Sequence, residues 1–233
     1  MPMQSSSNDA TSDAEVLARL TSGRFTCRAY QTTPVPNDVI ESIVEIARKT
    51  ASWCNVQPWH LLITSAETTQ SFRDALVEHA THASGIDSDI PFPEEYRGDF
   101  AERRREAGYR LYEALGIGRS DKDRRVAQGF ENFRMFGAPH VAIVTIPAEL
   151  GPYAGVDCGA FIGSFLLAAH AHGVATTPQG ALAQHARFVR SHFGIGDDRK
   201  MVCGIAFGYA KPDHPVNSFR TSRIPLDEVM RIV

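Results

Sequence analysis

The run His140-Val141-Ala142-Ile143-Val144-Thr145-Ile146 constrains the fold more than any other part of this sequence. Its apolar and β-branched side chains are nearly continuous rather than alternating, which indicates a strand buried on both faces. Residues 59–64 and 201–209 have the composition of two further buried strands. Helix-like and strand-like segments alternate throughout the chain, which is typical of strands surrounded by helices. We therefore predict a fold of mixed helices and strands in which helices surround the strands.

Helical periodicity flanks these strands. In residues 37–50, apolar side chains recur at i, i+3, i+4 and i+7, which indicates a helix with one buried face. Residues 156–172 form a long predicted helix rich in glycine and alanine, which allows close approach to another helix in the core or across a dimer interface. We expect further helices over residues 15–21, 67–83, 94–115, 122–135 and 186–193.

The chain has 233 residues, and its composition gives no reason to divide it into two domains. We predict a flexible tail at residues 1–13, rich in Ser, Asn and Asp, and one domain over residues 14–233. Residues 84–125 differ in character, because a proline-rich piece leads into a charged helix with scattered aromatic side chains. We interpret this excursion as a lid over a pocket. A helix pair that packs on a neighbouring element is the alternative.

The charge and the cysteine pattern exclude several classes of function. A formal net charge of −3 provides no basic surface for nucleic acid or an anionic membrane. No signal peptide is evident, and the longest apolar run, around residues 161–171, is too short to span a bilayer. The four cysteines form no C-x-x-C pair, and His79 and His82 lack further ligands at suitable spacing. We expect a cytoplasmic protein with reduced thiols and without a metal, a nucleic-acid partner or a membrane partner.

Two arginines near the N-terminus form a candidate anion clamp. Arg24 and Arg28 lie four residues apart around Phe25 and Thr26, directly after a glycine. Guanidinium groups make short, charge-assisted and often bidentate bonds to phosphate or carboxylate. Two solvated surface arginines are the alternative.

Two polar turns are candidates for binding a neutral heterocycle. Ser52, Asn55 and Gln57 lie between a predicted helix and a predicted strand, and Pro58 prevents the helix from continuing. Amide side chains both donate and accept hydrogen bonds, which suits the edge of such a ring. A helix cap followed by a core tryptophan is the alternative. The turn Pro178-Gln179-Gly180 can present an amide and backbone N–H groups in the same way, or be a plain turn.

No G-x-S-x-G, H-E-x-x-H or P-loop motif is present, so we expect a bound cofactor to carry any chemistry. From about Leu20 to the C-terminus, the chain resembles the nitroreductase family of FMN-dependent oxidoreductases. Four segments in the same order carry the resemblance: Arg24-Phe25-Thr26-Cys27-Arg28, Ser52-Trp53-Cys54-Asn55-Val56-Gln57-Pro58-Trp59, Pro178-Gln179-Gly180, and Arg220-Thr221-Ser222-Arg223-Ile224-Pro225.

The resemblance implies an α+β fold with a central mixed sheet surrounded by helices. It also implies an intertwined homodimer with C-terminal arm exchange and FMN at the interface. It implies that Arg24 and Arg223 hold the FMN phosphate, with help from Arg220. Thr221 stands where some relatives have a phosphate-binding lysine, so phosphate binding here would depend more on the arginines. It also implies that Thr26 and Arg28 lie near the ribityl chain and the pyrimidine side of the flavin, and that Phe25 is a further cofactor contact. Ser52, Asn55 and Gln57 would contact the cofactor as well, the first two of them from the partner. Pro178, Gln179 and Gly180 would lie along the ring near flavin N5.

The resemblance also implies the activity. A hydride from NADH or NADPH would pass through flavin N5 to flat, electron-poor acceptors such as nitroaromatics or quinones, in ping-pong fashion. Arg28 would support the negative charge of the reduced ring, with no catalytic side chain needed. Tyr109, Tyr112 and Phe133 are candidates for the acceptor pocket. The alternatives are a flavin-fragmenting or dehalogenating relative, or a flavin-binding sensor or carrier that does not turn over.

Overall fold

The computed structural model describes residues 11–233, so most of the predicted tail at 1–13 lies outside the described residues. The last tail residues already belong to the first helix, α1, because Ser12 and Glu15 form a reciprocal capping box. The fold is α+β, as predicted, and its elements follow in this order: α1 Asp13–Gly23, α2 Asn37–Ala47, η1 Trp53–Asn55, β1 His60–Ile63, α3 Ala66–His82, α4 Gly98–Ala114, α5 Lys122–Phe130, η2 Met135–Gly137, β2 His140–Pro147, α6 Pro152–Ala171, β3 Ala175–Gln179, α7 Gly180–Ala183, α8 Ala186–His192, β4 Arg199–Gly208, η3 Pro215–Asn217 and α9 Leu226–Val229.

The central sheet has the strand order β1-β2-β4-β3, and each neighbouring pair is antiparallel. Parallel pairing in the described residues is limited to two isolated bridges, Thr26 with Thr176 and Asp87 with His185. Only the first of these bridges involves a strand of the sheet, β3, so the mixed character expected for the sheet depends on Thr26 alone. The strand β2 is central and buried along nearly its whole length, which confirms the prediction from its continuous apolar composition.

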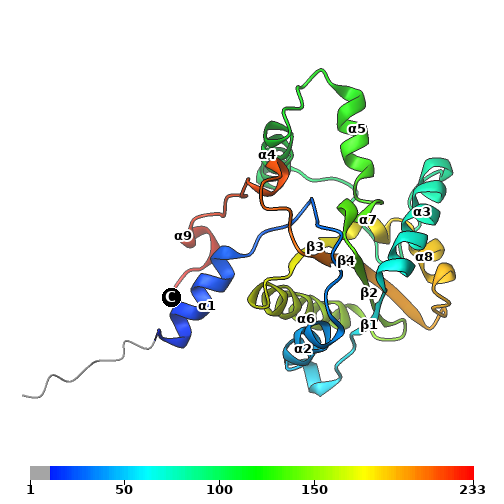
Figure 1. The fold of residues 1–233 in the computed structure, drawn as a ribbon. Helices are drawn as coiled ribbons and strands as arrows, with labels where there is room; N and C mark the ends of the chain where they lie inside the picture. Colours follow the sequence, from blue (N-terminus) through cyan, green and yellow to red (C-terminus); the bar gives the residue numbers. More distant parts are fainter. Residues whose placement is uncertain (1–10) are drawn as a thin grey trace, which may run out of the picture.

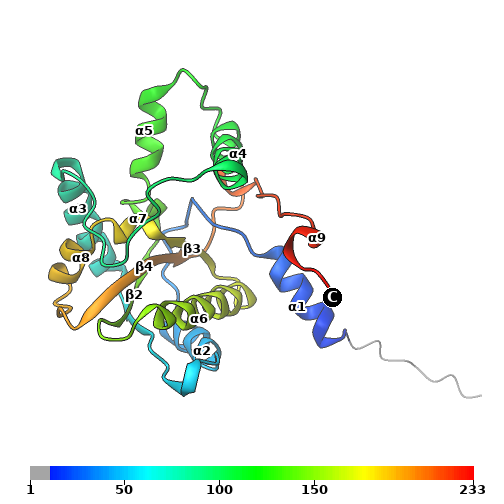
Figure 2. The same cartoon turned by 180° about the vertical axis from the view of Figure 1, so that it is seen from behind.

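Helices cover both faces of the sheet, and the side chains of β2 alternate between them. Ala142, Val144 and Ile146 pack in one core with α2 and α6, while Val141 and Ile143 pack in a second core with α3, α7 and α8. Figures 1 and 2 show α2 and α6 on one side of the strands and α3 and α8 on the other. Three of the four cysteines are buried within or beside these cores, and Cys54 is exposed.

The helix α6 is long and apolar enough to cross a membrane by length and composition. It also packs against α2 and β3, and seven of its residues are buried, among them Phe161 and Phe165. These contacts are those of a core helix. One side of α6 stays exposed along Val156, Gly159 and Gly163, so its small residues are not all used in core packing.

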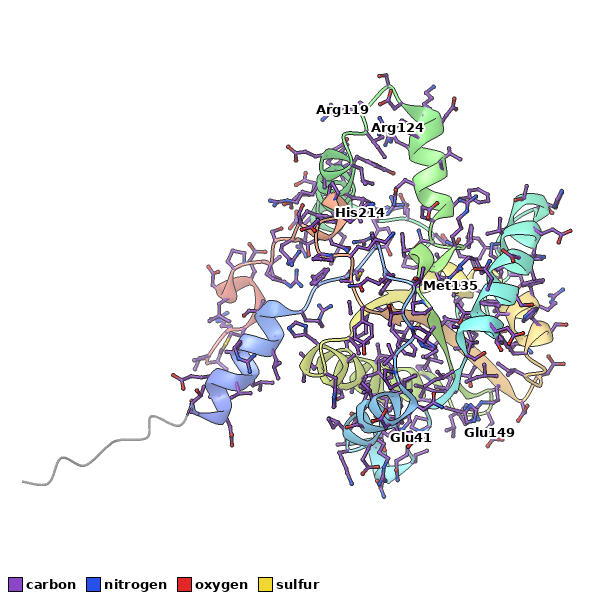
Figure 3. All side chains as sticks on the ribbon, in the orientation of Figure 1. Glu41, Arg119, Arg124, Met135, Glu149 and His214 are labelled. Carbon is purple, nitrogen blue, oxygen red and sulfur yellow. The ribbon has the colours of Figure 1, made fainter. Side chains whose placement is uncertain are left out.

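The helices α4 and α5 project away from the sheet (Figure 1), and the labelled Arg119 and Arg124 mark the far end of this projection (Figure 3). Both helices are shorter than predicted. The helix α4 begins at Gly98 rather than residue 94, and α5 ends at Phe130 rather than residue 135. After α5, the chain turns sharply through Met135 and Phe136, both with positive φ, and this turn leads into β2.

Candidate functional site

The two ends of the chain meet around a cavity of about 370 Å³, which we call the arginine cavity. One wall is the last turn of α1 and the segment that follows it, residues 21–28. The other wall is residues 218–225, which we call the C-terminal arm. The arginine cavity therefore brings together the first and last predicted cofactor segments, almost 200 residues apart. Its lining residues are Thr21, Ser22, Arg24, Phe25, Thr26, Arg28, Phe219, Arg220, Thr221 and Arg223.

Backbone contacts to the sheet fix the first wall. Thr26 forms the parallel bridge to Thr176 of β3, and the N–H of Cys27 donates to the carbonyl of Thr176. The N–H of Arg28 donates to Oδ1 of the buried Asn217 at 2.8 Å, and Asn217 Nδ2 donates to the carbonyl of Ala29 at 2.9 Å. Asn217 thus joins the two ends of the chain. Sequence reasoning did not assign it a role, because nothing local marks an asparagine that bonds to backbone so far away.

The arginine cavity concentrates positive charge without neutralising it. Among residues 11–233, no carboxylate lies within 4.0 Å of the guanidinium groups of Arg24, Arg28, Arg220 or Arg223. Burial, and secondly the nearby charge of Arg223, lower the pKa of Arg24, and burial lowers the pKa of Arg28. Like charges held together in partial burial are costly unless an anion joins them.

Aromatic rings support two of these guanidinium groups. Arg220 lies over the ring of Phe25 at 4.3 Å, and Arg28 lies over Phe219 at 5.5 Å. Each ring belongs to the wall opposite its arginine, so these cation–π contacts help to hold the two walls together.

The predicted turn at 178–180 lies where β3 passes into α7. Gln179 is buried, and its Nε2 donates to the carbonyl of Asn132 at 2.8 Å, whereas its Oε1 has no hydrogen-bond partner. A buried amide oxygen without a partner is costly and indicates a missing donor. A Cβ added to Gly180 would lie 3.4 Å from the ring of Phe92, so the turn lies against the excursion at this position.

The polar turn with Ser52, Asn55 and Gln57 does not line the arginine cavity within one chain. Ser52 Oγ accepts from the N–H of Gln57 at 2.9 Å, and Gln57 Nε2 donates to Asn55 Oδ1 at 3.1 Å. The backbone of Cys54, Asn55 and Gln57 has positive φ, which is strained for residues other than glycine. The neighbouring Trp53 is 57% exposed. The turn is therefore a strained, partly apolar surface feature.

The three candidates for the acceptor pocket lie in two different environments. Tyr109 and Tyr112 of α4 pack under the guanidinium groups of Arg119 and Arg125, each 4.9 Å from the ring centre. Phe133 packs edge-on against His185 at 5.1 Å, beside the core that includes α7 and α8. None of the three lines the arginine cavity.

Residues 21–209 match the model of the Nitroreductase family. The chain is 36% identical to nitroreductase NfnB of Mycolicibacterium smegmatis, in an alignment that covers 94% of this chain and 93% of that relative. It is 31% identical to a 4-nitrobenzoate reductase of Pseudomonas putida, in an alignment that covers 86% of this chain and 88% of that relative. The crystal structure of the FMN-dependent NfnB from Mycobacterium smegmatis in complex with NADPH has a TM-score of 0.89 and 35% identity, covering 94% of this chain and 99% of that one.

Proposed function

This chain belongs to the nitroreductase family, and on that premise we propose that it is an FMN-dependent oxidoreductase that passes electrons from NADPH or NADH to nitroaromatic compounds. The observation that carries the proposal is the arginine cavity, which gathers four guanidinium groups without a carboxylate partner in residues 11–233. The names of the relatives support the same reading, because they include an FMN-dependent enzyme bound to NADPH and a 4-nitrobenzoate reductase.

The residues present fit FMN. Arg24 and Arg223 repel one another across the arginine cavity, and a phosphate dianion would relieve that repulsion. Arg220 lies on the same arm and adds a third positive charge. Phe25 and Thr26 would lie along the phosphate and ribityl end. The unpaired Oε1 of Gln179 suits an N–H donor on a heterocycle, which agrees with placing Pro178, Gln179 and Gly180 at the flavin ring.

Bound FMN supplies two-electron transfer through N5, so the chain needs no nucleophile of its own. Its residues contribute binding and electrostatics. The guanidinium of Arg28 is partly buried and has no carboxylate partner in residues 11–233, and it would stabilise negative charge on the pyrimidine side of the ring. A preorganised donor of this kind contributes about 2–4 kcal/mol. In this proposal NAD(P)H would give a hydride, and the donor and the acceptor would use the same open face in turn, in ping-pong fashion.

The excursion is proposed to shape the acceptor site. Phe92 lies against Gly180, so an acceptor stacked near the 178–180 turn would meet the excursion there. Tyr109, Tyr112 and Phe133 stay candidates for this pocket. Quinones fit the same requirement for a flat, electron-poor ring and are proposed as further acceptors.

We propose a homodimer in which Ser52 and Asn55 contact the partner's cofactor, and in which Gln57 of the same turn also contacts a cofactor. The turn that carries them is distant from the arginine cavity in its own chain, and its strain suits a functional contact. Exposed apolar side chains beside it, Trp53 and Tyr153, pack edge-on at 4.3 Å and form part of an unpartnered surface. Exchange between protomers of the exposed C-terminal residues after 225, beyond the arm that lines the arginine cavity of its own chain, belongs to the same proposal. So does a soluble, cytoplasmic protein.

The visible spectrum of the purified protein tests the function. We expect flavin absorbance that disappears on anaerobic addition of NADPH or NADH and returns when 4-nitrobenzoate is added. The protein after turnover should contain intact FMN, which separates this activity from flavin fragmentation. A colourless protein that takes up no FMN would overturn the proposal, and bound flavin that NAD(P)H leaves oxidised would favour a sensor or carrier.

A further inference from the structure

The C-terminal arm carries Arg220 and Arg223 but has no helix or strand to fix their positions. Both guanidinium groups donate mainly to the backbone of their near neighbours. These local bonds shape the arm without placing it relative to the rest of the molecule. Arg220 is also held by its cation–π contact with Phe25, but every hydrogen bond of the Arg223 guanidinium stays within the arm. A further contact from outside the arm is therefore needed to hold Arg223 at the arginine cavity.

Glu106 of α4 provides such a contact. The hydroxyl of Ser222 donates to its carboxylate, 3.1 Å from Oε2 and 3.3 Å from Oε1. Ser222 lies between Arg220 and Arg223 in the sequence, so a restraint at this residue acts on both. A longer contact supports it, because Nη1 of Arg110 lies 3.5 Å from the carbonyl of Arg220.

The carboxylate of Glu106 is itself held in place. Nε and Nη2 of Arg110, one helical turn later, each lie 2.9 Å from Oε1, which leaves Oε2 for Ser222. The arm and α4 otherwise face each other across a cavity of about 550 Å³ rather than in close apolar packing. Figure 3 shows the arm below α4, close to the labelled His214. The polar contact at Ser222 is thus a main tie between the arm and the projection.

We propose that Glu106 is a positioning residue for phosphate recognition: by holding Ser222 it sets Arg220 and Arg223 at the arginine cavity and so couples the excursion to cofactor retention. The inference rests on the proposed function, because it takes FMN as the ligand. Glu106 acts through the arm and not by contact with the ligand, since a carboxylate beside a phosphate repels it. Removal of the Glu106 side chain also removes a negative charge, which alone would favour phosphate binding. If Glu106 positions the arm, its removal should nevertheless weaken phosphate binding.

Titration of the apoprotein with FMN and with riboflavin, followed by flavin fluorescence, tests the inference. Riboflavin has the same ring and ribityl chain but no phosphate. We expect Glu106→Ala and Ser222→Ala each to weaken FMN binding about three- to ten-fold, the range for loss of one hydrogen bond. The double variant should lose little more than either single variant. Riboflavin binding should not change, and Glu106→Gln, which keeps an acceptor oxygen, should recover part of the loss.

Glu102→Ala is the matched control. Glu102 lies one turn earlier on α4 and lines the same cavity, and its charge contact is Arg105 at 4.0 Å rather than the arm. The control should leave FMN affinity unchanged or raise it slightly. Unchanged FMN binding in Glu106→Ala, or an equal loss for FMN and riboflavin, overturns the inference while the proposed function stands. A wild-type protein that binds neither flavin overturns the proposed function, and the inference with it.

Discussion

Arg190 of α8 and Asp89 form an ion pair at the base of the excursion, with Nε 3.0 Å from Oδ2 and side chains only 12% and 15% exposed. Asp89 Oδ2 also accepts from the N–H of Met201 in β4 at 2.8 Å. Residues 84–89 are therefore fastened to the core, although the predicted excursion begins at residue 84. The freely projecting part starts after this anchor.

Asp89→Asn should destabilise the fold by about 3 kcal/mol, because it removes the one partly buried carboxylate of the pair and leaves the nearly buried guanidinium of Arg190 with only the exposed Asp197 as a charge partner. Asp197→Asn is the control. Its carboxylate contacts the same arginine at 2.7 Å but is fully exposed, so its loss should cost little. Urea denaturation of both variants measures the difference. Equal effects would show that burial of the Asp89 pair does not matter.

Arg223→Gln should weaken FMN binding by about 10- to 100-fold, which corresponds to the loss of a hydrogen bond to a charged group. Riboflavin binding should change little, since the phosphate is the proposed contact. Arg187→Gln, on α8 and 83% exposed at its side chain, removes the same charge far from the arginine cavity and serves as the control. The proposed role of Arg223 fails if both variants bind FMN alike.

Gly208→Ala should destabilise the protein by about 1–3 kcal/mol through overpacking. An added Cβ in β4 would lie 2.6 Å from Cδ of Pro139, whose ring cannot rotate away. Gly108→Ala in α4 meets nothing within 4 Å and should stabilise the helix by about 0.5–1 kcal/mol. Thermal unfolding of the two variants should move Tm in opposite directions, and a shared direction would contradict the packing described here.

Stability should fall as the pH is lowered from neutral towards 5. Burial, and secondly the neighbouring His79, lower the pKa of His185 below its ordinary value of 6.5. Below about pH 6.5 the unfolded chain therefore binds a proton that the folded chain resists, and the loss levels off below the folded-state pKa. His185→Phe should reduce this dependence in urea midpoints measured between pH 5 and 8. An unchanged slope would exclude His185 as a contributor.

Val156→Glu should convert the proposed dimer to a monomer without unfolding the chain. Val156 is 65% exposed on the small-residue side of α6, so a charge there costs little unless another protomer covers it. Val126→Glu is the control, because Val126 is 63% exposed on the projecting α5. Light scattering after size-exclusion chromatography gives the mass of each. A wild-type monomer, or a dimer in both variants, would contradict this surface assignment.

Sequence reasoning found the local elements because their physical signals are local. The apolar run of β2, the periodicity of α2 and the composition of β4 each follow from which side chains must leave water. Helix ends were less accurate, and α5 stops at Phe130 because the chain must turn into β2. That turn depends on tertiary packing and not on the propensity of residues 131–135.

By itself, the sequence determined the fold class, the main strands and the chemistry of the candidate ligands, since amino-acid type decides burial, charge and hydrogen-bonding capacity. Only the tertiary structure decided which groups meet. It placed Arg24 beside Arg223, tied Arg28 to Asn217 and linked Ser222 to Glu106. These pairs are far apart in the chain, and no local pattern records them. They form because the sheet and its two helical layers fix where the ends of the chain emerge.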